Sequence, residues 1–192
     1  MKIYTGRGDK GESGLLSGER VDKDDLRLKT YGTLDELQSH LGVARALARQ
    51  EPVRSVILAL QKDIFVASSE LASTPNGLAR LENRIGKEDI VRLEKWIDEF
   101  TELYGLPGSF VVPGRSTDSA VLHVARAVCR RCERLIVMLN RQESGLYDDL
   151  LIYYNRVSDL LFVIAWGLEV RAAVTKVVRD LLTSVVERGE NQ

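Results

Sequence analysis

The chain has 192 residues, of which 44% are hydrophobic and 29% charged, and its formal net charge at neutral pH is −1. A chain of this length suits one domain, which buries roughly 70% of its unfolded surface and needs no disulfide or structural metal. The balanced charge argues against non-specific nucleic-acid binding, which requires a basic face. With no apolar run typical of a signal peptide or a membrane span, we expect a cytoplasmic protein without nucleic-acid or membrane partners.

Polar residues dominate the N-terminal segment, which is punctuated by Gly6, Gly8, Gly11 and Gly14. Such glycines leave backbone N–H groups free to approach an anion. The stretch from Gly6 to Gly11 satisfies the pattern GxGxxG, but only Lys2–Thr5 precedes it as a candidate strand and no helix opens after it. A Rossmann site is therefore excluded. What remains is an unusual phosphate-binding loop or a flexible terminus, and the pattern alone favours the flexible terminus.

Apolar residues spaced three and four apart predict a series of amphipathic helices. The first begins at Lys23 and ends near Ala48, and the second follows Pro52 and ends at Leu71. Residues 73–86 predict a connection. The later predicted elements are a third helix through Ile90 and Phe100, a short extended piece at Ser109–Val112, a central helix at Val121–Asn140, a connection at Arg141–Asp149 and a last helix at Leu150–Val186.

These elements predict an all-α fold, a five-helix antiparallel bundle with a glycine-rich N-terminal loop. We expect one domain over residues 1–192, with the loop at 1–22, the bundle at 23–186 and a frayed tail at 187–192. A bundle alone does not identify a function.

The central helix combines a buried stripe with an unusual number of charges. At about 100° per residue, Arg126, Arg130 and Glu133 are predicted beside the stripe, and Arg131 and Arg134 further round towards solvent. Charges at the edge of a buried face are costly to desolvate unless they are paired. The helix is therefore either a salt-bridged surface helix or one wall of an anion site. The predicted stripe consists of Val121, Ala125, Val128, Cys132, Leu135 and Leu139.

The cysteines and histidines predict no chemistry of their own. Cys129 and Cys132 form a CxxC in mid-helix, with neither the second CxxC nor the histidine pair that structural zinc needs. We interpret both as small residues facing the core. His40 and His123 are interpreted as packing or surface residues.

Three separated segments together carry a resemblance to a known family. They are Tyr4–Gly14 with Lys23, Arg27 and Tyr31–Leu37; Phe110 with Pro113, Gly114, Leu122–Arg126 and Cys129–Arg134; and Tyr154–Phe162. In this order, from Lys2 to about Ala165, they closely resemble the PduO-type ATP:cob(I)alamin adenosyltransferases.

The resemblance implies a homotrimer of five-helix bundles of ferritin-like architecture, with active sites between neighbouring subunits. It implies transfer of the 5′-deoxyadenosyl group of ATP to cob(I)alamin, with release of triphosphate and with Mg²⁺ on the ATP phosphates. A flavoprotein reductase and an adenosylcobalamin-dependent enzyme are the implied protein partners. Because cob(I)alamin is itself the nucleophile, the protein needs no base and supplies in-line geometry.

The family's functional residues map onto several parts of the chain. Phe110 matches the aromatic residue under the corrin that keeps axial ligands off cobalt, and Asp35 and Arg126 match an ion pair between subunits beside it. Glu133 is better suited to Mg²⁺-bound water or a ribose hydroxyl than to phosphate. The implied ATP contacts are Thr5, Gly6, Arg7, Gly8, Ser13, Gly14 and Lys23 from one subunit and Arg130, Arg131, Glu133, Arg134 and Asn155 from its neighbour.

The chain departs from the family pattern at several positions. Gly6–Arg7 replaces a basic residue followed by Thr, Gln38 replaces Asn or Ser, Arg115 replaces Gly, and Trp166 replaces Arg. Two alternatives therefore stay open: a catalytically weakened ATP- or corrinoid-binding bundle or adenosylcobalamin carrier, and a plain helical interaction protein with a salt-bridged central helix.

Overall fold

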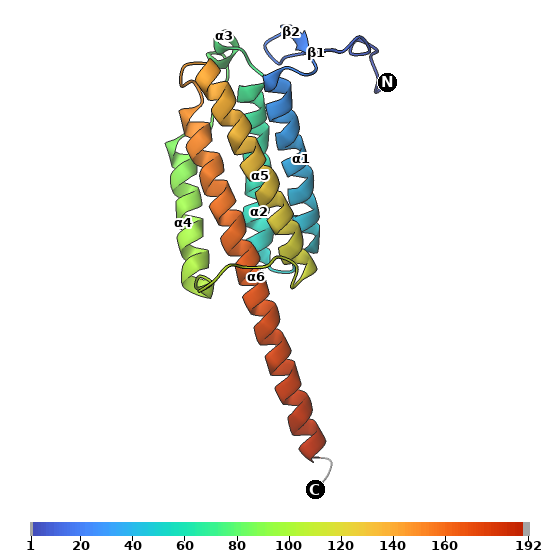
Figure 1. The fold of residues 1–192 in the computed structure, drawn as a ribbon, viewed down its shortest axis with the longest axis vertical. Coiled ribbons are helices and arrows are strands. Elements are labelled where there is room, and N and C mark those ends of the chain that lie inside the picture. The colour runs from blue at the N-terminus through green and yellow to red at the C-terminus, as the bar shows by residue number, and fades with distance from the viewer. Residues whose placement is uncertain (1, 190–192) are drawn as a thin grey trace.

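The protein is mostly helical, and the computed structural model describes residues 2–189, with side chains through residue 184. Figure 1 shows long helices lying side by side in a bundle, with the N-terminal segment at one end. The elements are β1 (Glu12–Gly14), β2 (Arg20–Asp22), α1 (Leu26–Leu47), α2 (Glu51–Leu71), α3 (Pro75–Leu78), α4 (Lys87–Tyr104), α5 (Thr117–Gln142) and α6 (Asp148–Gly189).

Helix α5 lies at the centre of the packing. It contacts α1 on one side and α6 on the other, while α2 packs on α1 and α4 packs on α6. Polar residues define where the helices start: the Asp25 carboxylate accepts from the Arg27 N–H at 2.7 Å, and Ser116 caps α5. Helix α4 ends at Tyr104 and is capped by Gly105, whose φ of +66° suits glycine.

The described residues form six helices, one more than predicted, because residues 75–78 of the expected connection make a short helix. Helix α3 places Leu78 in the core, and its Gly77 lies so close to Ser17 that an added Cβ would approach the Ser17 Cβ to 2.6 Å. The β1–β2 hairpin in the glycine-rich segment was also not predicted. Ser13 pairs with Val21 in its antiparallel register.

Helix α6 is much longer than the bundle and projects beyond it (Figure 1). From Arg171 to Thr183 every residue is exposed. The helix continues through Gly189, so residues 187–189 of the predicted frayed tail are helical, and residues 190–192 lie outside the described residues. Within residues 2–189, no helix has the length and apolar character needed to cross a membrane.

Candidate functional site

The hairpin orders the glycine-rich segment and brings it against Lys23. The Lys23 backbone N–H donates to the Gly11 carbonyl at 2.7 Å, and its ammonium group approaches Gly8 so closely that an added Cβ would lie 3.3 Å from Nζ. Arg20 donates to the Arg7 carbonyl at 2.9 Å, and the Arg7 N–H donates to the Thr5 hydroxyl at 3.4 Å. The interpretation as a flexible terminus is therefore replaced by that of an ordered turn with a cation beside it.

Arg27 fixes the start of α1 at this end of the bundle. Its buried guanidinium donates to the Tyr147 hydroxyl at 2.6 Å and to the Ser73 carbonyl at 2.9 Å, and it pairs with Glu143. The contacts join α1 to the segments before α3 and before α6. Arg27, a residue of the first motif, thus has a structural role at the start of α1, four residues after Lys23.

The predicted orientation of the arginines on α5 is partly wrong. Arg126 and Glu133 are half-buried, but Arg130 is exposed, as are Arg131 and Arg134. The reason is the position of the buried stripe, which is centred on Leu122, Ala125, Cys129, Cys132 and Ile136, all 0–1% exposed. At about 100° per residue, Arg130 and Arg131 fall on opposite sides of that stripe, and both reach solvent.

Arg130 and Arg131 nevertheless differ in their partners. The Arg131 guanidinium forms an ion pair with Glu36 on α1, which raises the Arg131 pKa through the hydrogen bond to that carboxylate. Arg130 has no hydrogen-bond or ion-pair partner among the described side chains. Its guanidinium is available to an anion, whereas that of Arg131 is engaged.

Two members of the predicted ATP set, Glu133 on α5 and Asn155 on α6, lie in direct contact. The Asn155 amide donates to Glu133 Oε1 at 3.0 Å, and its Oδ1 accepts from Arg156 at 2.9 Å. Arg156 in turn pairs with Glu94 on α4 at 2.9 Å. This network orients the Glu133 carboxylate and the Asn155 amide.

Within one chain the structure does not join the two groups of predicted ATP residues. No hydrogen bond or ion pair connects residues 5–23 with α5 in the part of the chain that the structure describes. Figure 1 shows the N-terminal segment running away from the bundle beyond the start of α1.

The surface between α1 and α5 gathers several charged side chains around a hollow of about 520 Å³. Arg126, Arg131 and Arg134 line it together with His40 and His123. Arg126 Nε is buried without a partner in the described chain, and Asp35 is exposed on the neighbouring helix. His123 is buried against the Phe162 ring, as its packing interpretation predicts, and burial lowers its pKa.

Phe110 is fully exposed, which is unusual for a large apolar side chain. Its neighbours Val112 and Leu106 are exposed too, at 81% and 61%. An aromatic side chain in this position contributes nothing to the core of the single chain. It is free to contact a ligand or another subunit.

The cysteines are confirmed as core residues. Both are free and buried, and the Cys129 thiol donates to the Tyr154 carbonyl at 3.4 Å. Burial raises the pKa of both thiols, that of Cys132 to about 12. Neither is a thiolate at neutral pH.

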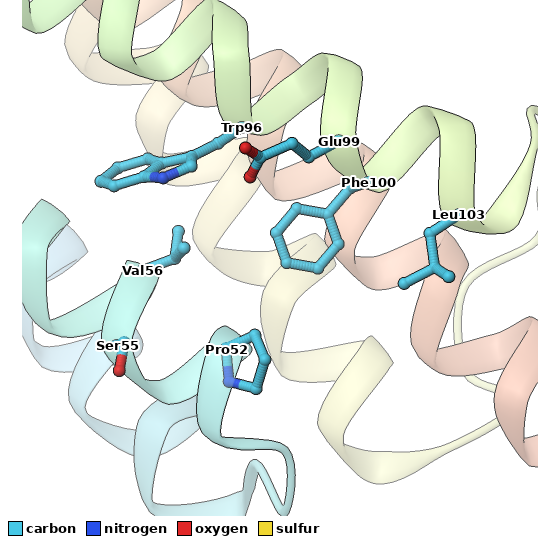
Figure 2. A pocket seen from close by; sticks show the side chains of 7 residues that line it. All are labelled: Pro52, Ser55, Val56, Trp96, Glu99, Phe100 and Leu103. Carbon is cyan, nitrogen blue, oxygen red and sulfur yellow. The ribbon is translucent and has the colours of Figure 1, made fainter.

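A separate groove of about 360 Å³ lies between α2 and α4, and Figure 2 shows the side chains that line it. Apolar side chains, among them Pro52, Trp96 and Phe100, form most of its walls. No predicted site residue lines it. Among residues 2–189, no three His, Cys, Asp or Glu side chains gather as a metal centre.

The chain is similar to known proteins over most of its length. A family profile described as "Cobalamin adenosyltransferase" matches residues 3–168. A corrinoid adenosyltransferase of Citrobacter freundii is 48% identical over 85% of this chain and 93% of its own. One of Bacillus subtilis is 36% identical over 100% and 98% of the two chains.

Solved structures agree with these matches. A variant of a PduO-type ATP:corrinoid adenosyltransferase from Lactobacillus reuteri, in complex with cobalamin and ATP, superposes with a TM-score of 0.81. It is 32% identical, over 88% of this chain and 93% of that one. Another variant of the Lactobacillus reuteri protein, in complex with ATP, gives a TM-score of 0.79 at 31% identity.

Proposed function

The chain belongs to the cobalamin adenosyltransferase family, and we propose that it transfers the 5′-deoxyadenosyl group of ATP to cob(I)alamin with release of triphosphate. The single structural observation that carries the proposal is the full exposure of Phe110. A phenylalanine exposed on an irregular segment has no role in the fold of one chain, whereas it suits the flat apolar face of a corrin.

The ATP site is proposed to form between two subunits of a homotrimer of five-helix bundles. Lys23 and the glycine turn of one subunit would meet Arg130 and the Glu133–Asn155 pair of its neighbour. The separation of these two groups within one chain supports this arrangement. The partnerless Nε of Arg126 and the exposed Asp35 likewise support an ion pair across the interface.

The residues of this site fit a nucleotide triphosphate. ATP carries about four negative charges, and charge-assisted hydrogen bonds from Lys23, Arg130 and the backbone N–H groups of the glycine turn would hold them. Mg²⁺ usually keeps several waters and takes one or two carboxylates. Glu133, which Asn155 orients, is the proposed carboxylate, and Mg²⁺ bound there would neutralise phosphate charge.

In this reaction the main task of the protein is to position ATP and cob(I)alamin. The electron pair on Co(I) attacks C5′ of ATP, a cobalt–carbon bond forms, and the C5′–oxygen bond breaks as triphosphate leaves. No proton is abstracted, so a protein base is not required. Phe110 would occupy the lower face of the corrin and keep water and the nucleotide base from cobalt, which favours four-coordinate Co(I).

The same chemistry indicates which proteins would act before and after this one. Co(I) must be supplied by reduction, for which we propose a flavoprotein reductase, and the product would pass to an adenosylcobalamin-dependent enzyme. We propose a cytoplasmic protein of one domain, with the nucleotide-binding loop at residues 1–22 and the helical part at 23–186, of which the end of α6 projects beyond the bundle.

An anaerobic spectroscopic assay tests the proposal. Cobalamin reduced to Co(I) is mixed with ATP and Mg²⁺, and the absorbance spectrum is followed with and without the protein. Conversion to adenosylcobalamin supports an enzyme. ATP-dependent thermal stabilisation without conversion would indicate a binding bundle, and the absence of both effects would indicate an interaction protein.

A further inference from the structure

The segment that carries Phe110, residues 106–115, makes few polar contacts with the rest of the protein. Within the described chain, none of its backbone or side-chain groups forms a hydrogen bond to another part of the protein. Gly105 and Gly114, at its two ends, have φ values of +66° and +115°, which permit the backbone to turn there. Only Pro107 and Val111 are partly buried.

The face of α6 beneath this segment holds polar atoms that lack partners. Glu169 is 2% exposed; its Oε1 accepts from the Ser119 hydroxyl at 2.7 Å, but its Oε2 has no hydrogen-bond partner. The indole N–H of Trp166, one turn earlier, is also buried without a partner. Such groups are costly to leave unsatisfied, so their presence together requires an explanation.

A pocket of about 180 Å³ separates these atoms from the segment. Its walls are residues 107–112, Arg115, Trp166 and Glu169. Arg115 and Trp166, two of the positions where the sequence departs from its family pattern, thus line the same space. The imidazole of His123 also faces this carboxylate, with Nε2 4.0 Å from Glu169 Oε1.

Residues 106–115 carry groups that could pair with the partnerless atoms of Glu169 and Trp166. The Arg115 guanidinium lines the pocket and has no ion-pair partner in the described structure. It is the segment's sole charged side chain, and it complements the free Glu169 Oε2. The unpaired carbonyls of residues 107–112 complement the Trp166 N–H. If the segment moved onto α6 and closed the pocket, Glu169 Oε2 and the Trp166 N–H would each gain a hydrogen-bond partner.

We infer that Glu169 and Trp166 are positioning residues, which anchor the segment bearing Phe110 through Arg115 when a corrinoid occupies the site. The inference rests on the proposed function. A bound corrin would cover the segment and exclude water from the pocket, and the Arg115–Glu169 attraction strengthens as its surroundings dry. Phe110 would thereby be fixed against the corrin face.

Hydrogen exchange of residues 106–115 tests the anchor directly. The backbone N–H groups of the segment should exchange rapidly in the free protein and in the ATP complex. On addition of cob(II)alamin to the ATP complex their exchange should slow by about tenfold or more, because docking protects them. In Glu169→Gln, which keeps the shape and the Ser119 contact, and in Arg115→Gln, most of that slowing should be lost.

Matched controls separate anchoring from a general effect on charge or folding. Glu102→Gln and Arg141→Gln remove exposed charges on α4 and α5 that have no ion-pair partner among the described residues, and should behave as wild type. Glu169→Gln should also slow adenosylation from cob(II)alamin with a weak reductant more than adenosylation of pre-reduced cob(I)alamin.

Two results would overturn the inference. One is a segment that is already protected in the free protein, and the other is equal slowing in wild type and in both anchor variants. The proposed function fails differently: cobalamin would then neither bind, as judged by its absorbance spectrum, nor be adenosylated by the wild-type protein.

Discussion

Phe110 packs against no core residue, so its substitution should affect activity and leave the stability of the fold almost unchanged. A buried phenylalanine costs about 3–5 kcal/mol of stability when truncated to alanine. Because Phe110 is exposed, Phe110→Ala should change the free energy of unfolding by less than about 0.5 kcal/mol. Thermal melting should show this, while adenosylation from cob(II)alamin with a weak reductant falls and ATP affinity is kept. A large loss of stability would instead make Phe110 a core residue.

Arg130 and Arg131 are adjacent and both exposed, yet we expect unequal effects on ATP binding. Arg130 is free to contact phosphate, and loss of a hydrogen bond to a charged group costs about 1.5–3 kcal/mol. Arg131 is paired with Glu36 at the surface, where its loss should cost under about 1 kcal/mol. Calorimetric titration of Arg130→Ala and Arg131→Ala with Mg·ATP compares them. Equal loss of affinity would refute the distinction.

At the level of elements, the sequence predicted the long helices well because their buried faces repeat every three or four residues. It did not predict α3 or the β1–β2 hairpin, which are too short to show a period and depend on contacts such as Gly77 against Ser17. The prediction that Arg130 lies beside the buried face of α5 was wrong because, at about 100° per residue, position 130 is roughly 120° or more from both the predicted stripe and the observed stripe centred on Cys129. Its side chain therefore reaches solvent with either stripe.

The stability of the bundle should not depend on the projecting part of α6. Residues 177–183 are exposed, and the core on this helix ends with Leu168 and Glu169. A chain that stops at Lys176 should therefore melt within about 1–2 °C of the full chain, since surface changes rarely exceed 0.5 kcal/mol. A clear drop in melting temperature would show that the extension packs on the bundle.

At the scale of the whole molecule, the sequence could identify the site residues only through family resemblance. Spacing along one chain says nothing of which subunit supplies each residue. The single chain keeps Lys23 and Arg130 in separate groups, so the proposed site is complete only between copies. Likewise, the exposure of Phe110 and the unpaired atoms on Trp166 and Glu169 depend on how the 106–115 segment crosses α6.

Subunit mixing tests this arrangement. Lys23→Ala and Arg130→Ala should each be nearly inactive alone, because each damages one half of every site. When they are refolded together, some interfaces combine the intact half of each variant, and activity should recover to roughly a quarter of wild type in a random mixture. Activity that stays at the level of the separate variants would place both residues in a site within one chain.

The fate of the two ends of ATP tests the central claim most directly. The protein is incubated anaerobically with cob(I)alamin, Mg²⁺ and ATP labelled either in adenine or in the γ-phosphate, and the products are separated. The account predicts adenine label in adenosylcobalamin and γ-label in triphosphate, formed in equal amounts. Label that stays in ATP, or that appears as ADP and phosphate without adenosylcobalamin, would contradict it.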